Sequence, residues 1–374
     1  MLKRLAKCVI IILTSLVVTG CWDQFLIKDA NLIFTAGVDR TEDGQFFTTV
    51  SIPKQETNRE SPTVRIATGT GHTLRESRNN IDNTVDGILD SSKIRVLLVE
   101  KVLAEEDLYA MLDLYYRDPR APLNAKIAIT EGKTYDALNV DIESQPLISD
   151  YYSRLIEGAE NRSIIPKMNI QYICPMMVDP GRDFVLPIIS LTSSNNMGVA
   201  LVSGVALFHG KIMTGQMTTE EGVMANLLSN TFYQSAQFTV DIEEEEQVMQ
   251  ALNYITVQVD SFDHQMNVEV NENDEVRANF HLNVYFNVAE FPPDNMDEQR
   301  IIYLNKKITD KLTALAETTI EKVQAANCDY FGIGREVMAY HNHIVEKSNW
   351  NELYPTIPID VTIHAEIVQH GIIN

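Results

Sequence analysis

Cys21 is the residue whose chemistry and surroundings point most directly to a function. It stands in the stretch LTSLVVTGCWDQ, just after an apolar run over residues 9–18, and a short basic segment precedes that run. This order of basic, apolar and small residues is typical of a secretory signal. A membrane-spanning helix needs about 20 apolar residues. The run is shorter than that, so we expect it to be removed rather than retained.

The four residues that end at this cysteine, Val18-Thr19-Gly20-Cys21, resemble a bacterial lipobox. In that motif lipid is attached to the cysteine thiol, and cleavage makes the cysteine the mature N-terminus. The usual leucine of the first position is valine here. We expect cleavage between Gly20 and Cys21 and lipid on Cys21; the alternatives are an uncleaved signal anchor or an ordinary cut that leaves a free thiol. A diacylglyceryl group would supply two acyl chains, which hold a protein stably where one does so only marginally.

Ser51 and Lys54 have the S-x-x-K spacing of penicillin-recognising serine enzymes, which place both residues on one helical turn so that the amine can take the hydroxyl proton. Residues 48–52 instead have the pattern of a strand, and the chain contains no S-D-N, K-T-G or G-x-S-x-G. The stretch ATGTGHT lacks the lysine of a phosphate-binding loop and the full dinucleotide pattern, so we interpret it as a helix entry. We predict no catalytic residues, no enzyme activity and no cofactor.

His341, His343 and Glu346 could contribute to a metal site, because imidazole and carboxylate suit zinc. The sequence defines no third and fourth ligand for the pair of histidines, and surface histidines near a helix end are far commoner than ligands. Glu220 and Glu221 open a predicted helix, where the N-terminal dipole favours carboxylates without any acid/base role. We therefore predict no metal site.

The chain is strongly acidic, with 30 Lys+Arg against 52 Asp+Glu and a formal net charge of −22. Residues 1–20 carry three positive and no negative side chains, so their removal takes the charge to −25 (−22 − 3). This charge argues against nucleic-acid binding and against docking on anionic lipid through a basic patch. Four adjacent glutamates in the run 241–246 cannot all converge on one ion, so we interpret the run as a solvated boundary.

Two of the four cysteines remain after the signal is removed and Cys21 is acylated, because Cys8 lies in the signal. The remaining pair is Cys174 and Cys328, whose separation shows no disulfide framework. We interpret both as buried free thiols, with a single bridge between them as the alternative.

The 354 residues that follow the signal (374 − 20) exceed the roughly 250–300 residues of a single core, which indicates two or three domains. We predict a mixed α/β protein of the α+β class with three consecutive domains, each a β-sheet with packed helices. The predicted division is a lipoprotein signal peptide at 1–20, an N-terminal α/β domain at 21–167, a small strand-rich middle domain at 168–240, and a C-terminal α/β domain with a long helix at 241–374.

Hydrophobic periodicity predicts the helices and strands of these domains. Strands are predicted at 31–38, 45–52, 94–99, 125–130, 169–173, 184–191, 199–208, 211–217, 254–259, 264–270, 276–288 and 357–368. Helices are predicted from Thr73 onward and at 105–117, 135–138, 147–157, 219–228 and 297–326. The first helix opens with a capping box of Thr73 and Glu76. Its apolar face is predicted to hold Leu74, Ser77, Ile81, Val85 and Ile88. The long helix has an apolar stripe at Ile301, Leu304, Ile308, Leu312, Leu315, Thr319 and Val323.

Several segments, in order along almost the whole mature chain, resemble the Ger(x)C family, the lipoprotein C subunits of spore nutrient-germinant receptors. They are GCWD at the lipid site, IRVLLVEKVLAEEDLYAMLDLYYRDPRAPLNAKIAI at 94–129, VLPIISL with GVALFHGKIMTGQMTTEEG within 185–222, and CDYFGIGREV at 328–337 with the later Trp350.

The resemblance implies three α/β domains and a complex with two integral-membrane receptor subunits, of A and B type, on the outer face of the spore inner membrane. It also implies a response to small nutrients that starts germination, with the ligand pocket on a membrane subunit, so we predict no germinant site in this chain. The alternative is the lipid-anchored solute-binding protein of a transporter, which would have two βαβ-rich lobes around a ligand cleft.

Overall fold

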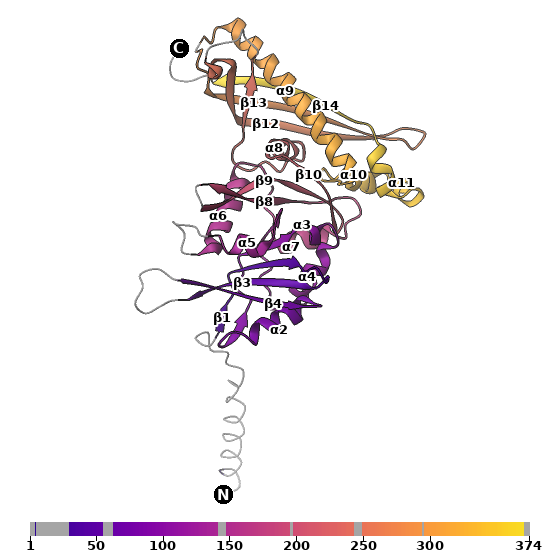
Figure 1. Ribbon diagram of the computed structural model, residues 1–374. Coiled ribbons are helices and arrows are strands. Elements are labelled where there is room, and N and C mark those ends of the chain that lie inside the picture. Colours follow the sequence, from indigo (N-terminus) through magenta and orange to yellow (C-terminus); the bar gives the residue numbers. More distant parts are fainter. Residues whose placement is uncertain are drawn as a thin grey trace.

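The computed structural model of the 374-residue chain describes residues 4, 30–54, 63–140, 147–194, 197–242, 249–293 and 295–369. These residues form a mixed α+β structure, as predicted, with sheets of two, eight and four strands. Figure 1 shows an elongated molecule in which the parts follow one another from the N-terminal to the C-terminal end. Within the described residues, no helix is long and apolar enough to cross a membrane.

The eight-stranded sheet has the order β10-β9-β8-β7-β6-β2-β3-β4. The pairs β2–β6, β6–β7 and β7–β8 are parallel and the others are antiparallel. Its strands are β2 (Thr35–Arg40), β3 (Phe46–Lys54), β4 (Thr63–Gly71), β6 (Val96–Glu100), β7 (Lys126–Thr130), β8 (Val185–Ser194), β9 (Met197–His209) and β10 (Ile212–Met217). The sheet continues across the predicted boundary after residue 167, because β8 pairs with β7. A separate short pair, β1 (Ala30–Leu32) and β5 (Ile88–Asp90), lies at the N-terminal end.

Helices cover both faces of this sheet, and the central strand β6 is therefore buried on both sides. Val96 and Leu98 of β6 pack with α5 (Thr134–Leu138) and α6 (Ile148–Asn161). Leu97 and Val99 point to the opposite face, since strand side chains alternate. That face is covered by α2 (Leu74–Asp82), α3 (Lys101–Ala104), α4 (Leu108–Arg117) and α7 (Ile170–Met176). A continuous apolar run such as that of β6 is what a doubly covered parallel strand requires.

Helix α2 begins as predicted but ends earlier than predicted. The hydroxyl of Thr73 accepts a hydrogen bond from the amide of Glu76 at 3.1 Å, and the Glu76 carboxylate accepts one from the amide of His72 at 2.7 Å. The helix stops at Asp82, so the prediction of Val85 and Ile88 on its face is wrong. Gly87, with φ of +99°, turns the chain into β5, where Ile88 is exposed.

The predicted strand at 169–173 is wrong, because this segment forms helix α7. The Asn169 side chain accepts a hydrogen bond from the amide of Tyr172 at 2.9 Å, which makes Asn169 the N-cap. Ile170 and Ile173 are buried three residues apart on one helix face, while Gln171 and Tyr172 are exposed. In so short an apolar segment, periodicity alone does not separate a strand from a helix.

The C-terminal part is a four-stranded sheet of order β11-β12-β13-β14 with the long helix α9 (Glu298–Ala325) lying along it (Figure 1). The strands are β11 (Gln237–Asp241), β12 (Tyr254–Val270), β13 (Val276–Glu290) and β14 (Ile359–Gln369). One strand, β12, replaces the two predicted at 254–259 and 264–270, because its pairing with β13 continues through a register shift between Val259 and Ser261. The predicted stripe of α9 is buried from Leu304 to Val323, and only its first residue, Ile301, is half-buried.

Helix α8 (Thr219–Leu228) joins the two large sheets. Figure 1 shows it between β8–β10 and β12, and one continuous apolar cluster runs from the eight-stranded sheet through α8 into the C-terminal sheet. Almost every residue of α8 is buried, which is the pattern of a helix surrounded by protein. The middle and C-terminal parts of the chain therefore share a core.

Candidate functional site

The predicted cleavage and lipid site, Gly20 and Cys21, lies outside the described residues. The described chain enters the fold at Ala30 in β1, at the end of the molecule farthest from α9 (Figure 1). Ala30 is the ninth residue after Cys21, and nine extended residues span at most about 30 Å. If Cys21 carries lipid, the domain that contains β1 is therefore the one nearest the membrane.

Ser51 and Lys54 do not form the pair that the S-x-x-K mechanism needs. Ser51 lies on a strand, as predicted, and the observed strand β3 continues past the predicted end at residue 52 to include Lys54. Residues three apart on a strand point to opposite faces. The Ser51 hydroxyl is buried and accepts a hydrogen bond from the amide of Thr35 at 3.1 Å. The ammonium of Lys54 lies 3.9 Å from a carboxylate oxygen of Asp86. The hydroxyl and the amine therefore serve separate structural contacts.

His341, His343 and Glu346 do not converge either. The Nε2 atom of His343 lies 3.0 Å from a carboxylate oxygen of Asp274, in the turn between β12 and β13. Glu346 accepts a hydrogen bond from the side chain of Asn342 at 2.7 Å, within α11 (Asn342–Lys347). Among the described residues, no three His, Cys, Asp or Glu side chains are grouped closely enough to hold a metal ion. The histidine–aspartate contact ties α11 to a hairpin.

Glu220 and Glu221 also have structural partners. Thr218 is the N-cap of α8, and its hydroxyl and the Glu221 carboxylate each accept the other's backbone N–H in a capping box. Glu221 also pairs with Lys322 of α9 at 2.7 Å, and this contact lowers the carboxyl pKa against the effect of burial. Lys311, also on α9, pairs with Glu220 at 3.3 Å. These pairs fix α8 to α9.

Asp329 is the centre of a buried polar network near the junction of the two large sheets. It follows α9, is 3% exposed and accepts four hydrogen bonds. One carboxylate oxygen accepts the amides of Gly332 and Ile333, both at 2.9 Å; the other accepts the amide of Gly334 at 2.7 Å and the indole N–H of Trp350 at 3.1 Å. Because all four partners are donors, they suit an ionised carboxylate, while burial raises the Asp329 pKa to about 7.

Asp183, just before β8, extends the network into the eight-stranded sheet. Its carboxylate accepts hydrogen bonds from the backbone amides of Asp329, at 2.9 Å, and Gly210, at 2.7 Å. In return, the backbone amide of Asp183 donates to the carbonyl of Asp329 at 3.0 Å. The Nδ1 atom of His209 lies 3.3 Å from the same carboxylate, and this hydrogen bond raises the His209 pKa. The network thus links β8 and the β9–β10 hairpin to the segment after α9.

The segment CDYFGIGREV and Trp350 therefore have a structural explanation. Gly332 adopts φ of +76° as the N-cap of α10 (Ile333–Tyr340). A Cβ on Gly334 would lie 2.5 Å from the indole nitrogen of Trp350, so only glycine fits there. The thiol of Cys328 is buried beside the Phe184 carbonyl, at 3.9 Å. Sequence reasoning singled out this segment only through its resemblance to a family, because nothing local in it indicates that Asp329 meets Asp183.

The two remaining cysteines are both free, as predicted. Cys328 is buried, which raises its thiol pKa well above the ordinary value. Cys174 is half-buried in α7, so the prediction of two buried thiols is right for Cys328 alone. Cys328, being buried, lacks the exposed setting that activates a cysteine thiol.

Two models of protein families match this chain, and together they cover most of it. The family models are Spore germination protein N-terminal domain, over residues 23–191, and Spore germination B3/GerAC like, C-terminal, over residues 203–371. Spore germination protein GerQC of Bacillus cereus is 24% identical over 97% of this chain and 98% of its own length. Spore germination protein KC of Bacillus subtilis (strain 168) is 19% identical over 100% of this chain and 98% of its own. The crystal structure of the GerBC protein shares the fold, with a TM-score of 0.56 and 13% identity over 90% of this chain and 98% of that one.

Proposed function

The chain belongs to the Ger(x)C family of spore germination proteins, and from this membership we propose that it is a lipid-anchored, non-enzymatic subunit of a spore nutrient germinant receptor. It assembles with two integral-membrane receptor subunits of A and B type on the outer face of the spore inner membrane, and it is required for germination in response to small nutrients. The observation that carries this proposal is the order of the two family matches, which account for residues 23–191 and 203–371.

The start of the first match supports the anchor. It begins at residue 23, two residues after Cys21, so the basic and apolar segment lies outside both family matches, as a removable signal would. Acyl chains are the attachment that suits a chain of net charge −25 after cleavage, since each Lys or Arg near anionic lipid contributes only about 1 kcal/mol. The N-terminal domain then faces the membrane, within about 30 Å of the lipid.

The polar contacts of the described residues support a non-enzymatic role. The groups that could have done chemistry are instead engaged in a contact between strands, in helix capping, in ion pairing and in the junction of the two large sheets. They are Ser51, Glu220, Glu221, His343 and Asp329. A subunit that transmits a signal by protein contacts needs such fixed junctions and no reactive centre.

The solute-binding alternative predicts two βαβ-rich lobes around a cleft. The described residues form instead an eight-stranded mixed sheet and a four-stranded sheet that share one core through α8. Micromolar binding of labelled nutrients by the purified protein, without membrane subunits, would favour the alternative.

The anchor is tested by replacing Cys21 with alanine and labelling spore-forming cells with a palmitate analogue. We expect the Cys21→Ala protein to lose the label and to leave the membrane fraction. Cys174→Ala is the matched control, because it removes a thiol of the folded domain and should keep both label and location. Unchanged labelling of the Cys21→Ala protein would contradict the proposal.

A further inference from the structure

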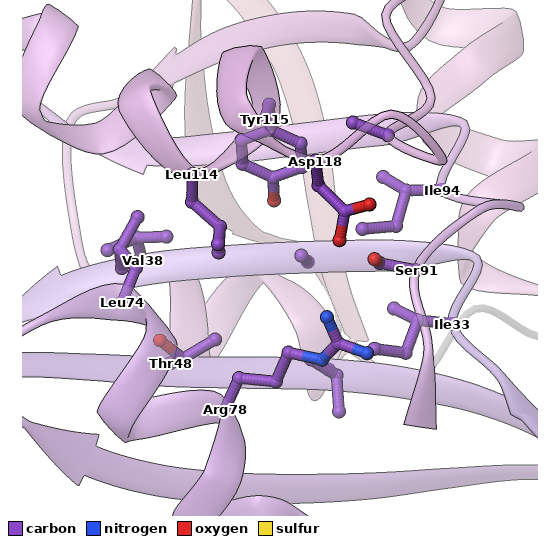
Figure 2. Close-up of a pocket in the computed structure, with 13 residues that line it drawn as sticks. Ile33, Val38, Thr48, Leu74, Arg78, Ser91, Ile94, Leu114, Tyr115 and Asp118 are labelled. Carbon is purple, nitrogen blue, oxygen red and sulfur yellow. The ribbon is translucent and has the colours of Figure 1, made fainter. Parts of the chain in front are cut away.

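A small cavity lies in the N-terminal domain between the sheet and the helices α2 and α4, with a volume of about 40 Å³ (Figure 2). Strands β2 and β3 form its floor with Ala36, Val38 and Val50. Leu74 of α2 and Leu114 of α4 form its sides. A buried water occupies about 10–15 Å³ by this measure, so the cavity has room for about three groups of that size.

The cavity is mostly apolar, yet polar side chains gather on one side of it. Figure 2 shows the hydroxyl of Tyr115, the carboxylate of Asp118, the hydroxyl of Ser91 and the guanidinium of Arg78 directed toward the same space. Ligand sites in proteins typically combine apolar walls with a few polar groups that converge in this way.

Arg78 is held in place but is not fully satisfied. One of its terminal nitrogens donates a hydrogen bond to the carbonyl of Leu89 at 2.6 Å, which fixes the guanidinium beside β5. Its Nε atom is buried and has no hydrogen-bond partner among the described residues, and the same holds for the hydroxyl of Thr48 on the floor. A buried donor without an acceptor costs about 1–3 kcal/mol, so an acceptor placed here would be favoured.

Asp118 is fixed by residues outside the cavity. It lies 3.7 Å from the guanidinium of Arg75 on α2 and 4.0 Å from that of Arg120, and its side chain is 13% exposed. These contacts join α2 to the C-terminal end of α4 beside the cavity. Among the described residues that line the cavity, Arg78 is the one cation. Its guanidinium donates to the carbonyl of Leu89 and not to Asp118.

We propose that this cavity binds a small acyl compound, with a carbonyl oxygen that accepts a hydrogen bond from Arg78 and a short aliphatic body against Val38, Val50 and Leu114. The shared chemistry is the carbonyl group, which is present both in a carboxylate and in a primary amide. The volume limits the ligand to a few heavy atoms. This site goes beyond the proposed anchoring and assembly, and it stands or falls independently of them.

The test uses the full-length protein in detergent and saturation-transfer NMR with three probes of matched size: acetamide, acetate and propylammonium. We expect saturation transfer to acetamide, to acetate or to both at tens of millimolar. Propylammonium, which has no acceptor, should give none. Binding of the amide alone identifies a neutral ligand and binding of acetate an anionic one, and either result supports the site.

Two variants locate the binding. Arg78→Met, which keeps the apolar stem but has no donor, should weaken it about tenfold, the loss expected for one hydrogen bond to a charged group. Ala121→Val, which adds two methyl groups to the lining, should abolish it even if Arg78→Met fails to fold. Arg117→Met is the matched control, because Arg117 is exposed on α4 and pairs with Asp113. Absence of transfer to every probe, equal transfer to propylammonium, or full binding by Ala121→Val would overturn the proposal.

Discussion

Replacing Asp329 with asparagine tests whether the buried carboxylate holds the two large sheets together. The substitution keeps one oxygen, which can still accept the amides of Gly332 and Ile333. It replaces the other oxygen with an NH₂ group that faces two donors, the amide of Gly334 and the indole of Trp350. Above pH 7, where Asp329 is ionised, two bonds to a charged acceptor are lost, each worth about 1.5–3 kcal/mol, so we expect the free energy of unfolding to fall by about 3–6 kcal/mol at pH 8.

The assay is urea unfolding followed by tryptophan fluorescence. The chain has two tryptophans, and Trp350 is buried against Asp329, so its emission reports the opening of this junction. Asp360→Asn is the matched control, because Asp360 lies on β14 with its side chain 60% exposed and pairs with Arg277 across the sheet. An exposed pair of this kind contributes at most about 1 kcal/mol.

The pH dependence of the same measurement has a definite sign. Burial raises the Asp329 pKa from 3.8 to about 7, so the folded state binds a proton more tightly than the unfolded state does. The stability that this group contributes is fully present below its ordinary pKa and is lost as the pH rises through about 7. The gap between wild type and Asp329→Asn should therefore narrow from about pH 4 to pH 7. A gap that is constant over this range, or no larger than that of Asp360→Asn, would refute the reasoning.

Two further predictions concern glycine packing and the thiols. Gly334→Ala should destabilise the protein by more than about 1 kcal/mol, because the new Cβ would lie 2.5 Å from the indole nitrogen of Trp350. Gly158→Ala, whose Cβ would meet no atom within 4 Å, should stabilise α6 by up to about 1 kcal/mol. Thermal unfolding compares the two variants, and equal effects would contradict this packing. Maleimide should label Cys174 in the native protein and Cys328 only after unfolding, because Cys328 is buried. Mass spectrometry detects the label at each cysteine. Rapid labelling of Cys328 in the native protein would contradict this prediction and show that the junction opens.

Local pattern predicted those elements whose burial is one-sided and regular. The stripe of α9 and the alternation of β14 each specify a period that matches the observed element. The pattern failed at α7, where two isoleucines three residues apart fit either a helix or part of a strand. The prediction also missed β4, whose burial pattern is irregular, and β11, although Phe238 and Val240 alternate there with exposed neighbours.

The polar junction could not be predicted because its partners are remote in the sequence. Asp183 and Asp329 are 146 residues apart, and neither has a local motif that specifies the other. What the sequence did contain was Gly-Ile-Gly after Asp329, a pattern compatible with amides at a helix start that bind a carboxylate. The division into domains at 167 and 240 stays a prediction, although the eight-stranded sheet and the shared core both run across those positions.

The central claim, that this chain is the anchored subunit of a membrane receptor, is tested most directly by purifying the tagged full-length protein from spore inner membranes. We predict that two integral-membrane germination proteins co-purify with it in comparable amounts, and that the Cys21→Ala protein recovers much less of them. Asp360→Asn, which leaves the anchor intact, serves as the control for expression and handling. Recovery of the wild-type protein without any membrane subunit would contradict the account.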